Sequence, residues 1–209
     1  MPLSRSRSFA ARTLLLVFAL LVAAACSSTP EAAPATTRRL ANTYFPLAVG
    51  NTWTYRASPA REDVPDESVT ILSKSADGFF VDNHGSRLQT RATGVFDGDR
   101  FLLEDPLEVG HTWLAVPSAS VVERFEIVET GAVVTVPAGR FTDCVRVRAK
   151  QEGPTPDGQH KVTLTMTWTY APGVGLVELV SQAAVDDGKP QEQGRRELVS
   201  YTFAGEAAR

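Results

Sequence analysis

Three residue types that could carry out nucleophilic hydrolysis lie close together at Asp82, His84 and Ser86. In a catalytic triad, the imidazole takes the proton of the attacking hydroxyl and the carboxylate orients the imidazole. Triads are assembled from distant segments beside an oxyanion hole, whereas these residues crowd one short turn, and the chain has no Gly-x-Ser-x-Gly nucleophile elbow. The segment therefore indicates a solvent-facing turn, and the sequence predicts no catalytic residue and no enzymatic activity.

Metal ligands are also poorly represented. The three histidines, His84, His111 and His160, have no metal-binding spacing to another histidine, cysteine or carboxylate. The Asp-Gly-Asp segment 97–99 could offer oxygens to calcium, but the further carboxylates of a calcium loop are missing. Asp-Gly is typical of a hairpin turn, which explains this segment without a bound ion. Because no other metal or cofactor motif is present, the sequence predicts no metal and no cofactor.

Cys144 is the second of two cysteines, and it has two interpretations. A reactive thiol needs a cationic neighbour, and Arg146 would lie two residues along on the same face of a strand. A small, mostly buried hydrophobe is the alternative, and it is the favoured interpretation because free cysteine is among the most buried residue types.

Cys26 has a clearer chemical role because of the segment before it. Arg5, Arg7 and Arg12 precede an apolar run, 14–25, that ends in three alanines. A basic head, a short apolar core and a small-residue exit are typical of a secretory signal peptide, which is too short to span a bilayer as a mature helix. We expect cleavage between Ala25 and Cys26.

A cysteine directly after the small residues resembles the lipobox of bacterial lipoproteins, although Ala23 stands where that family usually has Leu. The resemblance implies a thioether-linked diacylglycerol on Cys26 and attachment to a membrane through acyl chains such as palmitate. Ser27 and Ser28 follow without an Asp, which by the same resemblance implies the outer membrane, facing the periplasm. The Ala-x-Ala pattern would also suit ordinary signal peptidase, which would leave Cys26 unmodified.

The sequence predicts four regions: a signal peptide (1–25), a lipidated cysteine with a flexible linker (26–40), a globular domain (41–204) and a disordered tail (205–209). Residues 1–25 hold three of the 21 basic residues and none of the 24 acidic ones, so cleavage changes the net charge from −3 to −6. An acidic domain repels nucleic acid, so no nucleic-acid partner is expected. With Cys26 acylated, Cys144 has no disulfide partner.

The globular region has the pattern of an antiparallel all-β protein. Asp-Gly pairs at 77–78, 97–98, 157–158 and 187–188 predict hairpin turns, and segment 160–170 alternates apolar residues with threonines. Segment 121–130 is apolar on neither parity alone, which predicts a bulge or burial on both sides. We expect a sandwich or an open or half β-barrel of about twelve strands. They span 51–57, 67–74, 79–83, 87–93, 100–104, 111–115, 121–130, 133–137, 141–151, 160–170, 175–181 and 196–203.

Two short patterns recur. Pro-Leu-x-Val-Gly-x-Thr-Trp occurs at 46–53 and again at 106–113, which indicates a repeated strand entry and two related sub-sheets. Trp-Thr-Tyr occurs at 53–55 and 168–170, and the two rings of each pair share one strand face. These aromatic side chains would either fill the core or line a ligand groove made by Trp53, Tyr55, Trp113, Trp168 and Tyr170.

Segments 44–55, 136–147 and 170–177 together resemble a family of uncharacterised bacterial lipoproteins, often labelled TapB-like or left as a domain of unknown function. The resemblance implies an extracytoplasmic β-rich domain on a lipid anchor and supplies no catalytic residues. The TapB label associates the family with pilus or envelope assembly.

Two functions are therefore expected. The first is a lipid-anchored, non-catalytic envelope protein that binds an envelope protein or polymer as an assembly, structural or binding factor. The alternative is a periplasmic carrier or sensor that holds a lipophilic ligand in a β-barrel cavity. That alternative requires a pocket lined by some of the five aromatic residues.

Overall fold

The computed structural model describes residues 39–58, 64–118 and 121–205. The signal peptide, the cleavage site at Ala25, the acyl acceptor Cys26, most of the linker and residues 206–209 lie outside this range. The predictions made for those segments stay predictions.

Twelve antiparallel strands and one turn of 3-10 helix form the described domain, so the all-β prediction is confirmed. The helix η1 spans Ala41–Thr43, and no helix in the described part of the chain is long and apolar enough to cross a membrane. The first six strands are β1 (Thr52–Ser58), β2 (Glu67–Lys74), β3 (Phe80–Asp82), β4 (Arg87–Arg91), β5 (Gly94–Phe96) and β6 (Phe101–Glu104). The other six are β7 (Thr112–Ser118), β8 (Val121–Val136), β9 (Gly139–Pro154), β10 (Lys161–Ala171), β11 (Gly175–Val185) and β12 (Gln191–Thr202).

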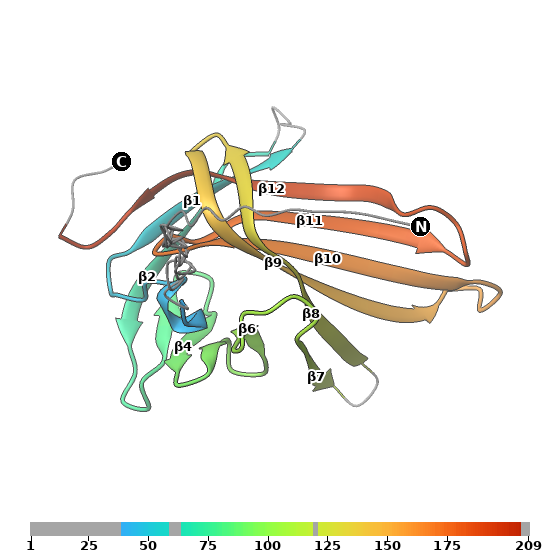
Figure 1. Ribbon diagram of the computed structural model, residues 1–209, viewed down its shortest axis with the longest axis horizontal. Coiled ribbons are helices and arrows are strands. Elements are labelled where there is room, and N and C mark those ends of the chain that lie inside the picture. The colour runs from blue at the N-terminus through green and yellow to red at the C-terminus, as the bar shows by residue number, and fades with distance from the viewer. Residues whose placement is uncertain (1–38, 59–63, 119–120, 206–209) are drawn as a thin grey trace, which may run out of the picture. The chain divides into compact units, whose positions relative to one another are not determined.

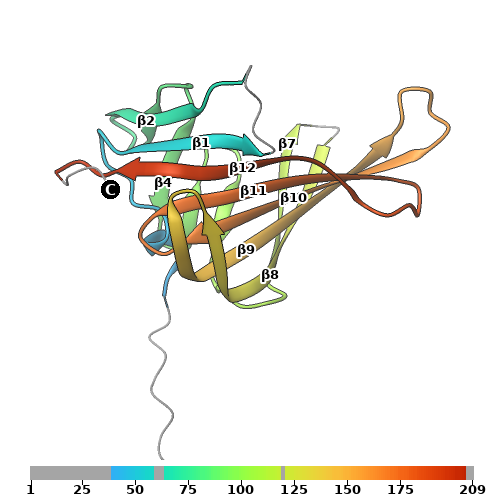
Figure 2. The same ribbon diagram turned by 90° about the horizontal axis from the view of Figure 1, so that it is seen from above.

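The strands form one sheet that curls into a nearly closed barrel (Figures 1 and 2). Their order is β6-β5-β4-β3-β2-β1-β12-β11-β10-β9-β8-β7, so consecutive strands pair in each half and β1 joins β12. The two free edges are β6 and β7, which follow each other in the chain. Of the architectures that the sequence left open, the structure has the open barrel rather than the sandwich.

Side chains bridge the gap between β6 and β7. The indole Nε1 of Trp113 on β7 donates a hydrogen bond of 2.9 Å to the carbonyl of Phe101 on β6. Next to it, the Arg100 guanidinium forms an ion pair with Glu123 on β8. The seam of the barrel is therefore held by side chains in place of a backbone ladder.

The longest hairpin, β8–β9, explains the irregular pattern of segment 121–130. Its register shifts between Ile127 and Glu129 and twice more before Val134, which confirms the predicted bulge. The bulges turn the end of the hairpin toward β12, where the Ala138 N–H donates to the Leu198 carbonyl at 2.9 Å (Figure 1).

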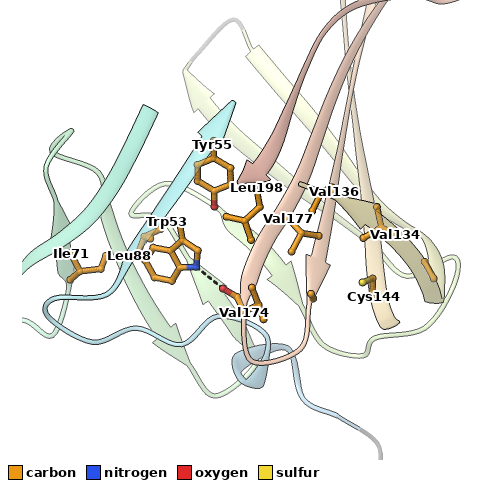
Figure 3. Close-up of a cluster of buried hydrophobic side chains, with 12 residues drawn as sticks. Trp53, Tyr55, Ile71, Leu88, Val134, Val136, Cys144, Val174, Val177 and Leu198 are labelled. Carbon is orange, nitrogen blue, oxygen red and sulfur yellow. Dashed lines mark hydrogen bonds between the residues drawn. The ribbon is translucent and has the colours of Figure 1, made fainter. Parts of the chain in front are cut away.

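The core consists of two neighbouring clusters of buried side chains. Figure 3 shows the first, in which Trp53 donates from its indole Nε1 to the Val174 carbonyl at 2.6 Å. Its other members include Tyr55, Ile71, Leu88, Val134, Val136, Cys144, Val177 and Leu198. The second cluster contains Ala41, Tyr44, Leu103, Trp113, Ala115, Phe125, Ile127, Val145, Val147, Ala149 and Tyr170.

The repeated Pro-Leu-x-Val-Gly-x-Thr-Trp segments enter β1 and β7 in the same way. Gly50 and Gly110 have φ angles of 94° and 90°, a conformation that glycine adopts at low cost. Each glycine N–H donates to an isoleucine carbonyl, of Ile71 or Ile127, at 2.8 Å, and the isoleucine N–H donates back to the residue after the glycine at 2.9 Å. The repeat thus starts each six-stranded half, but the halves form one continuous sheet and not two.

The strand count agrees with the expected number, but several boundaries were wrong. β11 was expected to end at 181 and ends at Val185, and β12 was expected to begin at 196 and begins at Gln191. The expected strand 87–93 ends at Arg91, and the short strand Gly94–Phe96 was missed because three residues are too few to show alternation. Conversely, the two strands expected at 121–130 and 133–137 are the single strand β8. Gly131, with a φ of 73°, lies within its bulged region and does not end the strand.

Candidate ligand-binding site on the inner face of the sheet

The alternation in β10 places four apolar side chains on one side of the strand: Leu164, Met166, Trp168 and Tyr170. Tyr170 packs in the same cluster as Leu103 from β6 and Phe125 from β8, which belong to distant parts of the sheet. This side of β10 therefore faces the interior of the barrel, and we call it the inner face.

Three cavities follow one another along the inner face of β10. The outermost, about 240 Å³, is lined by Gln151, Gly153, Pro154, Val162 and Leu164. The middle cavity, about 310 Å³ and largely apolar, shares Leu164 and Gln151 with it and adds Met166, Trp168 and Ala149. The innermost, about 150 Å³, shares Trp168 with the middle one.

The innermost cavity brings together four of the five aromatic residues expected at a ligand groove. Trp53 and Tyr55 from β1 and Trp168 and Tyr170 from β10 line it. Their rings do not close the space completely, although Trp53 and Tyr55 are each at most 5% exposed. Whether this space takes a ligand stays a prediction.

Trp113, the fifth expected residue, lies elsewhere. It stacks on Phe125 with ring centroids 5.4 Å apart and planes 7° apart, and its indole bridges the seam to Phe101. Phe125 in turn contacts Trp168, with centroids 5.8 Å apart. Trp113 therefore packs against Phe125, which contacts the cavity-lining Trp168, and does not itself line the innermost cavity.

The charges at the innermost cavity are already balanced. Arg196 on β12 lines it, lies over the Tyr55 ring at 5.0 Å, and forms an ion pair of 2.6 Å with Glu67. Burial raises the pKa of both Tyr55 and Tyr170 above the ordinary phenol value, so both hydroxyls are neutral. The Tyr55 hydroxyl donates to the Leu176 carbonyl at 3.0 Å. The cavity thus offers apolar surface and no uncompensated charge.

Polar groups appear in the middle cavity. Ser181, Gln182, Gln193 and Gln151 contribute to its lining, and the Ser181 hydroxyl already donates to the Gly194 carbonyl at 3.1 Å. These four groups are neutral, and the lining also includes the charged residues Glu123 and Lys150. The Glu123 carboxylate is already neutralised by its ion pair with Arg100, so it does not meet an apolar occupant as an unpaired charge.

The sequence did not single out Leu164, Met166, Ala149 or Leu176 as lining residues. The signal for the first two was present, because both lie on the same parity as Trp168 in the alternating segment. Ala149 and Leu176 could not be found this way, since their place at the cavities depends on pairing between strands.

Asp82, His84 and Ser86, the residues of the types found in a catalytic triad, have a structural role. One carboxylate oxygen of the buried Asp82 accepts hydrogen bonds from the N–H groups of His84, at 2.9 Å, and Ser86, at 2.8 Å. The His84 ring contacts the Ser68 carbonyl at 3.1 Å. Asp82 therefore stabilises the turn between β3 and β4.

The remaining candidates are likewise accounted for by local structure. Asp97 accepts from the N–H of Arg100 at 3.1 Å in the β5–β6 hairpin, as the Asp-Gly pattern predicts. Cys144 is fully buried, and burial raises the pKa of its thiol to about 11 despite the cationic Arg146 nearby. Within the described residues, no three His, Cys, Asp or Glu side chains gather in a way that could hold a metal ion.

Comparison with known proteins leaves the family open. No model of a protein family and no curated protein matches the chain. A crystallised "putative lipoprotein" from Parabacteroides distasonis has a TM-score of 0.43 and 13% identity, covering 77% of this chain and 98% of its own. A "putative exported protein with YmcC-like fold" from Bacteroides fragilis has a TM-score of 0.42 and 15% identity, covering 77% and 99%. Likenesses this weak assign neither family nor function, so the TapB-like resemblance stays a prediction.

Proposed function

We propose that this chain is a lipid-anchored, non-catalytic protein of the cell envelope whose open β-barrel holds a lipophilic ligand. The anchor is the diacylglyceryl group expected on Cys26, and the expected location is the periplasmic side of the outer membrane. Two or more acyl chains anchor a protein stably where one does not.

The observation that carries the ligand-binding role is the row of cavities along the inner face of β10. A protein that needed this sheet only as a scaffold would fill the interior with side chains, since interiors are normally close-packed. Here, apolar and aromatic side chains instead border open space, with a few polar and charged groups among them, which is the usual composition of a small-molecule site.

Native mass spectrometry of the protein extracted from its own cell envelope tests this function. The expected spectrum shows the mature chain from Cys26 onward with covalent acyl groups, plus a non-covalent adduct that organic solvent removes. An unmodified Cys26 would contradict the anchor. A protein with no adduct that also fails to bind added apolar dyes would contradict the ligand-binding role.

A second candidate function, docking of an envelope protein, is favoured by the free edge of β7. Leu114 and Val116 on this edge strand are 58% and 62% exposed, and an exposed apolar edge is a template for pairing with another chain. A photo-crosslinker at Val116 in living cells would then capture one specific protein, whereas the same group at the exposed Val185 on β11 would not. Equal patterns from the two positions would contradict docking at β7.

A further inference from the structure

We propose that the inner face of β10 accommodates a single extended hydrocarbon chain, with its methyl end at Trp168 and its polar end toward Val162. This inference rests on the proposed ligand-binding function and specifies the class of ligand. A fatty acid and the acyl chain of a larger lipid share this chemistry.

The arrangement of the cavities favours a linear occupant. Each cavity shares a lining residue with the next, Leu164 between the outer two and Trp168 between the inner two. The largest of these three cavities has a volume of about 310 Å³, so a bulky ring system would fit in only one of them. A thin chain, in contrast, would contact all three in turn.

The length of the row matches a lipid chain. From Val162 to Tyr170 the strand rises about 27 Å at ~3.4 Å per residue. One leaflet of the hydrocarbon core of a bilayer is about 15 Å thick, which is the depth occupied by one acyl chain. The inner face of β10 is therefore long enough to cover a whole chain.

The charges set the direction of the chain. At the inner end, Arg196 is the only charged side chain among the described residues that line the cavity. Its guanidinium is already neutralised by an ion pair of 2.6 Å with the Glu67 carboxylate. Near the outer end, Lys161 pairs with Glu152 and His160 with Asp186, all about half exposed to solvent. The middle cavity is bordered by Glu123, which pairs with Arg100, and by Lys150. The innermost cavity beyond Trp168 offers no unpaired charge to a head group, whereas the outer end is exposed to solvent, so the polar head group lies toward the outer end and the methyl end lies inside.

Quenching of tryptophan fluorescence tests this placement. The probes are stearates that carry a doxyl nitroxide near the methyl end or near the carboxylate, added to the full chain with Cys26→Ser so that its own acyl groups do not compete. We expect the methyl-end label to quench Trp168 several-fold more strongly, and Trp168→Phe to remove that difference.

A chain-length series and two matched variants sharpen the test. Each methylene removed from a saturated fatty acid should weaken binding about fourfold. Leu164→Glu, at a position already 44% exposed, should weaken binding at least about tenfold by placing a charge in the row of cavities. Thr167→Glu, on the opposite face of β10 and paired with Arg148 of β9, which lines none of the three cavities, should leave binding unchanged.

The outcomes separate the two proposals. Equal quenching by both labels, or equal loss of affinity in Leu164→Glu and Thr167→Glu, would overturn the extended chain while leaving an apolar site in place. Binding of an anilinonaphthalene dye without any binding of fatty acids would do the same. Failure of every apolar probe to bind would overturn both.

A single-chain lipid and the acyl chain of a larger lipid are distinguished by the same titration. Lysophosphatidylcholine and free stearate should both compete for the site if only the chain is recognised. Competition by stearate alone would restrict the ligand to free fatty acids, and competition by neither would overturn the placement.

Discussion

At the scale of single residues, the tryptophan of the first strand-entry repeat stabilises the core both by its burial and by a hydrogen bond. The Trp53 indole is 1% exposed and donates to the Val174 carbonyl, 121 residues away in the chain, at 2.6 Å. Trp53→Phe should lower the free energy of unfolding by about 1–3 kcal/mol, because a buried carbonyl loses its donor. Urea denaturation would measure this. The half-buried Trp168→Phe serves as a control, and an equal loss there would contradict the role of the Trp53 hydrogen bond.

Cys144 should be chemically inert in the native protein. Because burial raises its pKa to about 11, almost no thiolate exists near about pH 8, and iodoacetamide should label it only after unfolding. The protonated thiol is favoured in the folded state, so stability should fall as the pH rises from the unfolded value of about 8.5 toward 11. Mass spectrometry before and after denaturation checks the labelling. Rapid labelling of the folded protein would contradict this burial.

The sequence predicts residue types at this scale better than it predicts partners. The buried state of Cys144 and the hairpin turn at Asp97 follow from local patterns. The acceptor for the Trp53 indole could not be predicted, because it depends on which turn the barrel brings to β1. At Asp82 the turn was predicted, but the sequence placed it facing solvent, whereas the Asp82 carboxylate is buried and accepts hydrogen bonds from two N–H groups of that turn.

At the scale of elements, the missed strand β5 makes a close contact that depends on glycine. A Cβ at Gly94 would lie 2.1 Å from the Leu103 carbonyl oxygen of the paired strand. Gly94→Ala should therefore lower the free energy of unfolding by about 1–3 kcal/mol or more. Gly153→Ala in β9, where a Cβ has open space, should change it by less than about 0.5 kcal/mol. Similar thermal unfolding of the two variants would contradict the close approach of β5 and β6.

The seam between β6 and β7 should open when its ion pair is weakened. Glu123→Gln replaces the charge-assisted bond to Arg100, so backbone amides of β6 and β7 should exchange hydrogen about tenfold faster. Glu152→Gln, which breaks the exposed pair with Lys161, should not affect the seam. Unchanged exchange in Glu123→Gln would mean that the ion pair does not hold the seam.

Strand boundaries were predictable where alternation is long and regular, as in β10, which the sequence placed within one residue at each end. They were not predictable where a bulge interrupts the period. In β8, Gly131 has the backbone conformation of a turn, yet the strand continues because β9 pairs on both sides of it.

At the scale of the whole described domain, the sequence could not decide between sandwich and barrel, since both bury one face of each strand and give the same alternation. The decision depends on the pairing of β1 with β12, which joins the two halves and leaves a single seam. The same closure brings Trp53 and Tyr55 to Trp168 and Tyr170. Four of the five expected groove residues therefore come together only because β1 pairs with β12. The fifth, Trp113, packs against Phe125 outside the innermost cavity.

The central claim is that an apolar chain binds along the inner face of β10. Titration of the full chain carrying Cys26→Ser with palmitate, followed by amide NMR, tests it most directly. The account predicts that the largest shift changes fall on Leu164, Met166 and Trp168 and on their β9 and β11 neighbours Ala149 and Ser181. Shift changes confined to the β7 edge around Leu114 and Val116, or none at all, would contradict it.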